Sequence, residues 1–453
     1  MTKRILALVL VFMLLAASAL AEIAGPLFEA DSLSDSYAAT SGAFIFTKDR
    51  MEGLVDREGN VLCDAQFGDL SYAAWGYFEA TNEGGFNTSA LVNTAGEAMT
   101  PFEYSDFKVV SPNWAVAVVL EGTNDKDNSD YTVIFGSYDY AVVVRYDVFY
   151  LPEKKLVGTL ERKQFSRGKE TGLGGYLLVE DSSGNVTLYD SAFNPVDTLL
   201  TSMYDPELIV KSESELTAKA LYSAVTGEKL ADREYDYLTG MNNGGAVFCD
   251  YDTRLYGILS PSGEEICPPT YSMISSSLYE GRYVKVTVNK DDGTSAEGLY
   301  DLEERKEVIP PLYQRIYQWG EKHIINNGYV CVEQDGKLGF IDLEGNVTCP
   351  IQYAEDSVKD YGCTLGAVDL TGAVTLIAAD GTVTALEGVT EINIKNGNTD
   401  SDGYYLTVKD ADDHQAVIDW HGNYLTEFAL DYSAAIYGTD CLSTNTSIYK
   451  LPR

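Results

Sequence analysis

The stretch Gly339-Phe-Ile-Asp-Leu-Glu-Gly-Asn-Val-Thr-Cys-Pro-Ile-Gln-Tyr353 decides the fold, because the chain repeats its frame. A short apolar run ends at Asp342, Gly345 follows three residues later, and the next run carries a proline and ends on Tyr353. A short acceptor side chain opens a tight turn, and a glycine near the end of the turn supplies a positive φ. The stretch therefore predicts two β-strands joined at residues 342–345.

The same frame returns along the whole chain. The clear copies are Gly53 to Phe67, Ala90 to Tyr104, Gly257 to Tyr271, Gly298 to Tyr313 and Ala416 to Gly422, and the weaker ones centre on Gly227, Gly381, Asn194 and Lys154. The turn residues lie at 59, 96, 154, 194, 227, 263, 305, 345, 381 and 422, mostly 33 to 42 residues apart; the one wide interval contains the polar insert Glu121 to Asp130. Such a period indicates a repeat protein of about ten units. Its turn and core residues include Asp56, Gly59, Asn93, Gly96, Gly263, Tyr271, Tyr313, Asp342, Gly345, Tyr353, Asp419 and Gly422.

Each unit has the pattern of three strands, with a possible fourth in the longer copies, because apolar and polar positions alternate. No helical stripe is evident, so we expect an all-β fold with scarce helix. One small unit cannot bury both of its faces, so neighbouring units must stack. The variable spacing favours a β-propeller, and an open β-solenoid or superhelix is the alternative. The number of blades and the closure of the ring stay open at this stage.

The first 21 residues have the pattern of a signal peptide. Lys3 and Arg4 precede an apolar run from Ile5 to Ala17, and Ala19-Leu20-Ala21 is the small-x-small pattern that signal peptidase cleaves. We expect cleavage before Glu22, a single β-repeat domain over 22–453, and a secreted or cell-envelope location. An uncleaved anchor is the alternative, but the apolar run is short for a membrane span. No later segment has the length and hydropathy of one.

The chain is strongly acidic, with 69 Asp and Glu against 32 Lys and Arg and a formal net charge of −37. Loss of Lys3 and Arg4 with the leader makes this −39. Such a charge excludes a general nucleic-acid binder and disfavours attachment to anionic lipid. It favours a basic partner. With 45% hydrophobic residues the chain still has enough apolar side chains for a large core.

The seven cysteines first suggest disulfides, since the chain is expected to be exported. Cys63, Cys267 and Cys349 all stand four residues after the turn glycine, where other units have Thr, Ile or Ala. Cys249 and Cys331 share another frame position. Interchangeable slots indicate buried structural thiols. A disulfide between Cys331 and Cys349 is disfavoured, because a middle strand would separate them by about 9.6 Å.

Candidate chemical sites are few, and we nominate no catalytic residue, cofactor or metal ligand. His414 and His421 lie at odd spacing across one strand, which suits exposed residues better than metal ligands, and His323 is isolated. The loop from Asn398 to Gly403 alternates oxygen side chains, but it lacks the bidentate Glu of a calcium-binding EF-hand. Weak calcium binding there stays open. Acidic pairs of the kind that cleave glycosides cannot be nominated among so many acids.

The frame G-[ILVF]-x-[DN]-x-x-G-x-x-[IV]-x-P-x-x-[YF] resembles that of the WG-repeat family, whose mostly bacterial members carry a Trp before the first glycine. The match covers residues 50–104 and 250–430 well and the middle of the chain poorly. The resemblance implies a scaffold of β-strands, usually presumed to bind other molecules. This chain is a divergent member, because Glu52, Tyr256, Glu297 and Leu338 occupy the family's Trp position.

Repetition without a single catalytic island favours a non-catalytic exported scaffold that binds a protein, a peptide or a cell-envelope component. The alternative is carbohydrate binding, for which Trp75 and Trp319 are the candidate stacking platforms, although ordinary strand packing also accounts for both. A propeller-type hydrolase is the third hypothesis. It would need an off-repeat cluster of acidic and basic side chains, which the sequence does not show.

Overall fold

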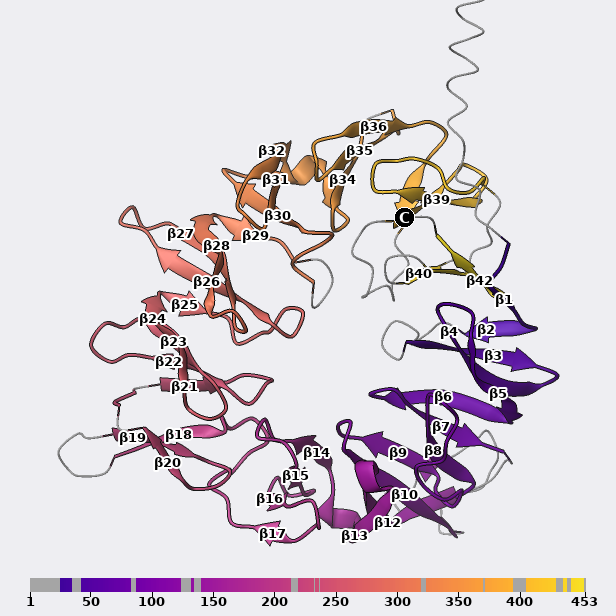
Figure 1. Cartoon of the computed structure of the whole chain (residues 1–453), viewed down its shortest axis with the longest axis vertical. Coiled ribbons are helices and arrows are strands. Elements are labelled where there is room, and N and C mark those ends of the chain that lie inside the picture. Colours follow the sequence, from indigo (N-terminus) through magenta and orange to yellow (C-terminus); the bar gives the residue numbers. More distant parts are fainter. Residues whose placement is uncertain are drawn as a thin grey trace, which may run out of the picture.

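The computed structural model describes residues 25–34, 42–82, 87–123, 132–133, 140–212, 219–231, 233–235, 237–318, 323–369, 371–393, 405–428, 435–437 and 441–451. The expected leader, Trp319 and the Asn398–Gly403 loop lie outside these residues. The described residues form eleven antiparallel sheets arranged around a ring (Figure 1), and each sheet is one blade of a β-propeller. The expectation of an all-β propeller is confirmed.

The blades follow one another in chain order. Blade 1 contains β2 (Ser32–Ser34), β3 (Ala43–Lys48), β4 (Met51–Asp56) and β5 (Val61–Phe67); blade 2 contains β6 (Asp69–Ala74), β7 (Tyr77–Thr81) and β8 (Ser89–Asn93). Blade 3 contains β9 (Asp106–Val109), β10 (Trp114–Thr123), β11 (Thr132–Val133), β12 (Tyr140–Tyr150) and β13 (Lys155–Glu161); blade 4 contains β14 (Arg167–Glu170), β15 (Leu177–Glu180), β16 (Val186–Tyr189) and β17 (Pro195–Val196). Blade 5 contains β18 (Leu208–Ser212), β19 (Lys219–Ser223) and β20 (Lys229–Ala231).

The second half of the ring is more regular. Blade 6 contains β21 (Tyr237–Gly240), β22 (Ala246–Cys249), β23 (Tyr256–Leu259) and β24 (Glu265–Tyr271); blade 7 contains β25 (Met273–Ile274), β26 (Tyr283–Asn289), β27 (Ser295–Asp301) and β28 (Lys306–Tyr313). Blade 8 contains β29 (Arg315–Ile316), β30 (Tyr329–Gln334), β31 (Lys337–Asp342) and β32 (Val347–Ala354); blade 9 contains β33 (Lys359–Asp360), β34 (Thr364–Val368), β35 (Val374–Ala378) and β36 (Val383–Leu386). Blade 10 contains β37 (Glu391–Asn393), β38 (Tyr405–Lys409) and β39 (Gln415–Asp419). The helices of the described residues are the short 3-10 turns η1 (Leu151–Glu153), η2 (Arg162–Gln164) and η3 (Glu355–Ser357).

Both ends of the chain build the eleventh blade. Its strands β40 (Ala435–Tyr437), β41 (Cys441–Ser443) and β42 (Ser447–Lys450) are completed by β1 (Phe28–Glu29), which pairs with β42. Its apolar side chains pack against blade 1 on one side and against blade 10 on the other. The ring therefore closes, which excludes the open solenoid. Repeat counting found ten units and missed this blade, because its strands come from both ends and lack the turn frame.

The ten turn residues found in the sequence follow the equivalent strand of blades 1 to 10, and the frame around them has a structural reason. In blade 8, Leu338 pairs with Tyr353 and Phe340 with Cys349, so three residues of β32 bulge opposite the single residue Gly339. A Cβ on Gly339 would lie 2.6 to 2.8 Å from backbone atoms of Ile351 and Cys349. Pro350 lies in this bulge, where a missing N–H is tolerated. The register shifts in the same way opposite Gly53, Gly257 and Gly298.

The core consists of apolar layers between neighbouring blades. Phe340 is fully buried, and it packs with Cys331 and Cys349 of its own blade and with Leu365 and Ile377 of blade 9. All seven cysteines are buried, and none of them forms a disulfide. Burial raises the pKa of the Cys267 thiol to about 12 and that of Cys349 to about 11. The cysteines act as small apolar residues, and Phe340 of the middle strand separates Cys331 from Cys349 as expected.

Two glutamates that stand directly before the frame glycine, Glu52 and Glu297, connect neighbouring blades. The Glu52 carboxylate accepts the backbone N–H of Leu70 in blade 2 at 2.5 Å, and the Glu297 carboxylate accepts that of Ile316 in blade 8 at 2.7 Å. Both accepted groups belong to the first strand of the following blade. A carboxylate at this position therefore satisfies an amide at the edge of the next sheet, as a Trp side chain could not, because its ring nitrogen only donates.

Candidate binding site on the rim of blades 2 to 6

The turn residues singled out in the sequence lie in separate blades. Asp56 accepts the backbone N–H groups of Glu58 and Asn60, at 2.9 and 2.7 Å, and the glycine of this turn, Gly59, has φ +82°. The same pattern holds Asn93, Asp342 and Asp419 at their turns. The matching glycines, Gly96, Gly263, Gly345 and Gly422, all have positive φ. These residues shape each blade and are not brought together in one site.

The frame tyrosines also belong to the scaffold. Tyr271 is buried, and its hydroxyl donates to Glu307 of the next blade at 2.6 Å. Tyr313 and Tyr353 are half-buried against the layers next to their blades. The aromatic candidates for ligand contact differ from them: Trp75 is 59% exposed, and Trp319 lies outside the described residues.

His414 and His421 are held by turns at opposite ends of β39. Asp410, Asp412 and His414 could each offer a metal ligand within 4.8 Å of the others. Asp410 accepts the backbone N–H groups of Asp412 and His414, as the aspartates of the other turns do. His421 contacts Asp380 of blade 9, with 2.9 Å between the ring nitrogen and the carboxylate oxygen. That contact connects the turns of two neighbouring blades.

A cavity of about 680 Å³ lies where the first strands of blades 2, 3, 4 and 6 end, and we call this region the rim of blades 2 to 6. Its walls are the turns that join the first to the second strand in blades 2, 3, 4 and 6, together with the segment that precedes β18 in blade 5. The lining residues are Trp75, Val110, Ser111, Pro112, Gly168, Lys169, Glu170, Thr171, Gly172, Met203, Tyr204, Asp205, Pro206, Glu207, Gly240, Met241, Asn242, Asn243 and Gly244. Five consecutive blades thus line one hollow, four of them through the same turn.

Blade 5 explains why the hollow forms here. Its sheet has three strands and begins with β18, the partner of β19, so it lacks a first strand like β14 or β21. The turns of blades 4 and 6 meet across this gap. A Cβ on Gly172 would lie 2.3 Å from the Cα of Gly244, and a Cβ on Gly244 would lie 2.4 Å from the Cα of Gly172. Two glycines therefore let blades 4 and 6 touch over blade 5.

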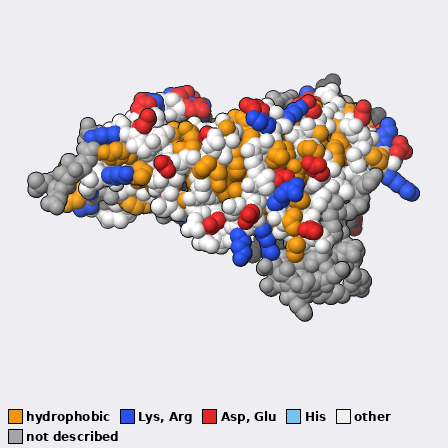
Figure 2. Space-filling model, turned by 90° about the horizontal axis from the view of Figure 1, so that it is seen from below, with side chains coloured by type: hydrophobic (Ala, Val, Ile, Leu, Met, Phe, Trp, Pro, Cys, Tyr) orange, Lys and Arg blue, Asp and Glu red, His pale blue; other side chains and the backbone are white. Residues whose placement is uncertain are grey.

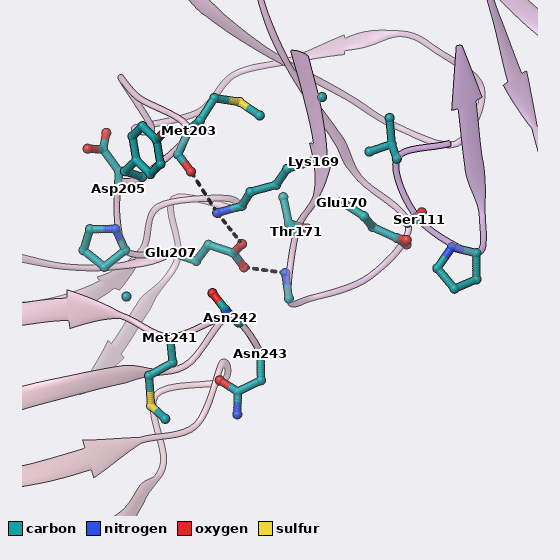
Figure 3. A pocket seen from close by; sticks show the side chains of 18 of the residues that line it. Ser111, Lys169, Glu170, Thr171, Met203, Asp205, Glu207, Met241, Asn242 and Asn243 are labelled. Carbon is teal, nitrogen blue, oxygen red and sulfur yellow. Dashed lines mark hydrogen bonds and ion pairs between the residues drawn. The ribbon is translucent and has the colours of Figure 1, made fainter. Parts of the chain in front are cut away.

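A buried carboxylate lies directly beneath this contact. Glu207 is 3% exposed, and its carboxylate accepts the backbone N–H of Gly172 at 2.7 Å. The Lys169 ammonium lies 3.6 Å from the same carboxylate and donates to the Met203 carbonyl at 3.2 Å (Figure 3). Burial raises the pKa of Glu207, and Lys169 with the Gly172 amide partly offsets that rise. The site thus holds a desolvated acid that one lysine compensates.

The cavity has more acids than bases. Glu170, Asp205 and Glu207 line it, against Lys169 alone. Glu170 accepts from the Asn113 amide and from the backbone of Gly175, both at 2.9 Å. Asp205 accepts from neighbouring groups of its own turn. Within the described part of the chain neither carboxylate has a cationic partner, so the lining has an excess of two negative charges.

Two exposed aromatic side chains lie at the mouth. Trp75 is held at φ +56° in the turn between β6 and β7. Tyr204 is 76% exposed, and Arg167 lies 4.8 Å from its ring centroid and donates to its hydroxyl at 2.6 Å. A smaller hollow of about 410 Å³ shares Val110 and Gly168 with the cavity and follows the first strands of blades 2 to 4. The two hollows together form an elongated site.

The outer surface near these blades is mixed in character. Seen edge-on, from the lower edge of the ring in Figure 1, it has apolar patches with acidic and basic side chains around them (Figure 2). Val144 and Leu156 of blade 3 are among the exposed apolar residues, at 38% and 48%. Among the residues that the structure describes, no helix combines the length and the hydropathy needed to span a membrane.

Sequence reasoning found one member of the site, Trp75. It missed Glu207, Thr171 and Tyr204, because the repeat frame is faint in blades 4 and 5 and no motif points to them. A signal was present in the two glycine-rich turns, Thr171-Gly-Leu-Gly-Gly175 and Asn242-Asn-Gly-Gly245, which interrupt the frame.

No family model and no curated protein matches this chain. Solved structures match at low identity. The crystal structure of the eukaryotic initiation factor is 12% identical, with a TM-score of 0.31, and the match covers 71% of this chain and 89% of that one. The C-terminal WD40 domain of Sif2 is 10% identical, with a TM-score of 0.23, and covers 95% and 99%. The computationally designed Ika8 protein is 12% identical, with a TM-score of 0.22, and covers 80% and 98%. These values are too low to inform what this chain binds.

Proposed function

We propose that this chain is an exported, non-catalytic propeller that binds a basic peptide or protein along the rim of blades 2 to 6. The observation that carries the proposal is the cavity itself, since five consecutive blades line it and it has a surplus of carboxylates beside two exposed aromatics. Aromatic side chains and clefts of this size are typical of recognition surfaces. The overall charge of −37 would steer basic partners toward it.

Export and membership of the WG-repeat family belong to the same proposal. Support for export comes from Lys3-Arg4, the apolar run and the Ala19-Leu20-Ala21 pattern. N-terminal sequencing of the protein from its native host should give Glu22 as the first residue, and an intact Met1 would contradict export. Support for the family comes from the repeated glycine, proline and aromatic frame, whose bulged strand recurs in blades 1, 6, 7 and 8.

The binding proposal is tested with an array of basic, neutral and acidic peptides, followed by titration of the best binders in solution. We expect basic peptides to bind and their affinity to fall as salt is raised. Tyr204→Ala should weaken binding by about tenfold, since exposed aromatic contacts often dominate an interface. Tyr251→Ala is the control, because Tyr251 is similarly exposed, at 54%, and lies outside the cavity. Equal binding of acidic and basic peptides would contradict the proposal.

Carbohydrate binding is the second candidate, and the exposure of Trp75 beside a polar cavity favours it. An indole ring can stack on a sugar face, and the neighbouring carboxylates and amides can accept and donate hydrogen bonds. A glycan array and titration with peptidoglycan fragments test this reading. Carbohydrate binding would be favoured over peptide binding by a glycan that quenches the tryptophan fluorescence of wild type and does not bind the Trp75→Phe variant.

A further inference from the structure

We propose that the cavity beneath the contact of blades 4 and 6 binds an alkylammonium group, with Glu207 and Thr171 as its acceptors. A lysine side chain of the basic partner would supply this group, so the identity of the ligand rests on the function proposed above. The site itself is argued from the residues around it.

Charge is the first argument. The lining has three carboxylates and one ammonium, and within the described residues two of those carboxylates have no cationic partner. Glu207 is nearly inaccessible to solvent, and a carboxylate in such surroundings is stabilised strongly by a nearby cation. Lys169, at 3.6 Å, is beyond ordinary hydrogen-bond distance from it. An incoming ammonium would therefore gain more here than at an exposed acid.

Thr171 is the second and independent argument. Thr171 lines the cavity and is 3% exposed, and its hydroxyl has no hydrogen-bond partner among the residues that the structure describes. Its backbone groups are satisfied within the turn, by Tyr176 and Gly174. Buried hydroxyl groups almost always have a partner, so an orphan that lines a cavity points to a missing donor. An ammonium donates in three directions and can serve Thr171 and Glu207 together.

The geometry favours an ammonium over a guanidinium. One oxygen of Glu207 already accepts from Gly172 and the other faces Lys169, so no free edge remains for the parallel pair of bonds that arginine makes. Figure 3 shows Lys169, Glu207 and Asn242, from three blades, directed toward the same part of the cavity. Of these three side chains, Glu207 and Asn242 offer acceptor oxygens from two different blades, which suits a compact tetrahedral donor.

The walls suit an alkyl stem. Gly168, Gly240 and Gly244 leave the sides without side chains, and Pro206 and Met241 supply apolar surface. A lysine stem buries its methylene groups against such surfaces while its ammonium reaches polar partners. At the mouth, Trp75 and Tyr204 could contact the backbone on either side of the inserted residue.

The test is calorimetric titration of the full protein with three small probes: Nα-acetyl-lysine methylamide, its norleucine analogue, which lacks the ammonium, and cadaverine. We expect the lysine probe to bind and the norleucine probe to produce no heat. Glu207→Gln should weaken the lysine probe by about tenfold and Thr171→Val by about fivefold. Circular dichroism of each variant checks that it is folded.

Glu297→Gln is the matched control. Glu297 also accepts a backbone N–H at 2.7 Å and has a lysine, Lys285, at 3.9 Å, but it lies outside the cavity. This variant should bind the lysine probe as wild type does. If Glu207→Gln and Glu297→Gln bind it equally, the site is wrong.

The outcomes separate this inference from the proposed function. Basic peptides that bind wild type and Glu207→Gln equally would overturn the inference and leave the rim function standing. A lysine probe that binds through Glu207, with no peptide binding at all, would support the ammonium site and contradict the peptide function. If cadaverine binds more tightly than the lysine probe, the ammonium site is supported, but its ligand is a free diamine and not a lysine side chain.

Discussion

Blades 7 and 8 and blades 4 and 5 are built from the same unit but differ in how closely they follow it. Blades 7 and 8 have four strands, the glycine that faces the bulge, and proline in the fourth strand. Blade 5 has three strands and lacks the first, so its neighbours meet across it through Gly172 and Gly244. The cavity is lined by the turns of blades 4 and 6 on either side of blade 5. Departures from the repeat, rather than the repeat itself, therefore create the candidate site.

This comparison predicts that the regular blades carry more of the stability. Phe340→Ala in blade 8 should lower the free energy of unfolding by about 4 kcal/mol, since a fully buried ring leaves a cavity that rigid neighbours cannot fill. Chemical denaturation measures the loss. Val347→Ala, in the adjacent β32 but 56% exposed, is the control and should change it little. Similar losses for the two variants would contradict tight packing in this half of the ring.

The contact between blades 4 and 6 should be the sensitive point of the irregular half. Gly172→Ala would put a methyl group 2.3 Å from the Cα of Gly244, so the turns must separate, at a cost of about 2 kcal/mol. Thermal denaturation measures the stability, and the lysine probe tests whether the cavity survives. Gly25→Ala, where the added methyl group meets open space, is the control. Unchanged stability and binding in Gly172→Ala would show that the two turns do not need to touch.

The same comparison shows what the sequence could predict. The all-β class, the propeller, ten of the blades and the buried thiols followed from residues such as Gly339, Cys349 and Tyr353, because local turn chemistry and strand pairing set them. The eleventh blade could not be counted, because Phe28 and Ile448 lie at opposite ends of the chain and pair only once the ring closes.

The candidate site was harder to predict than the fold. Trp75 was visible as an aromatic outside the frame position, but nothing local connects it to Glu207 or to Thr171. These residues come together because blade 5 lacks its first strand. In the sequence, the missing strand is visible only as a weak copy of the repeat. Whether a given acid is buried, as Glu207 is, depends on packing among three blades.

Two acids in low-dielectric surroundings extend the comparison to pH. In the irregular half, the ammonium of Lys169 compensates the charge of Glu207. In blade 9, burial raises the pKa of Asp360 to about 7, even though a hydrogen bond from the Gly362 amide lowers it. Because this value lies above that of an unfolded Asp, Asp360 costs stability as pH rises from about 4 to 7. Asp360→Asn, which keeps an acceptor for Gly362, should therefore raise stability by about 1 kcal/mol or more at about pH 8, and little at about pH 4.

Denaturation of wild type and Asp360→Asn across that pH range measures the difference, and Asp356→Asn on the exposed η3 turn serves as the control. A gain that is equal at both ends of the range would mean that the folded protein does not perturb this carboxyl group. Glu207→Gln should show no comparable gain at high pH, because it leaves Lys169 without its charged partner.

The smallest effect should come from the ion pairs that connect the turns of adjacent blades on the surface. Arg305 of blade 7 contacts Glu264 of blade 6 through two hydrogen bonds, and a single ion pair between Lys154 and Glu97 connects blades 3 and 2. Both arginine and glutamate are exposed, at 49% and 55%, so water and salt screen their attraction. Arg305→Ala should therefore leave the melting temperature unchanged at about 0.15 M salt and lower it slightly at about 0.01 M. If Arg305→Ala loses as much thermal stability at the higher salt as Gly172→Ala does, surface ion pairs, and not the apolar layers between blades, determine the stability of the regular half of the ring.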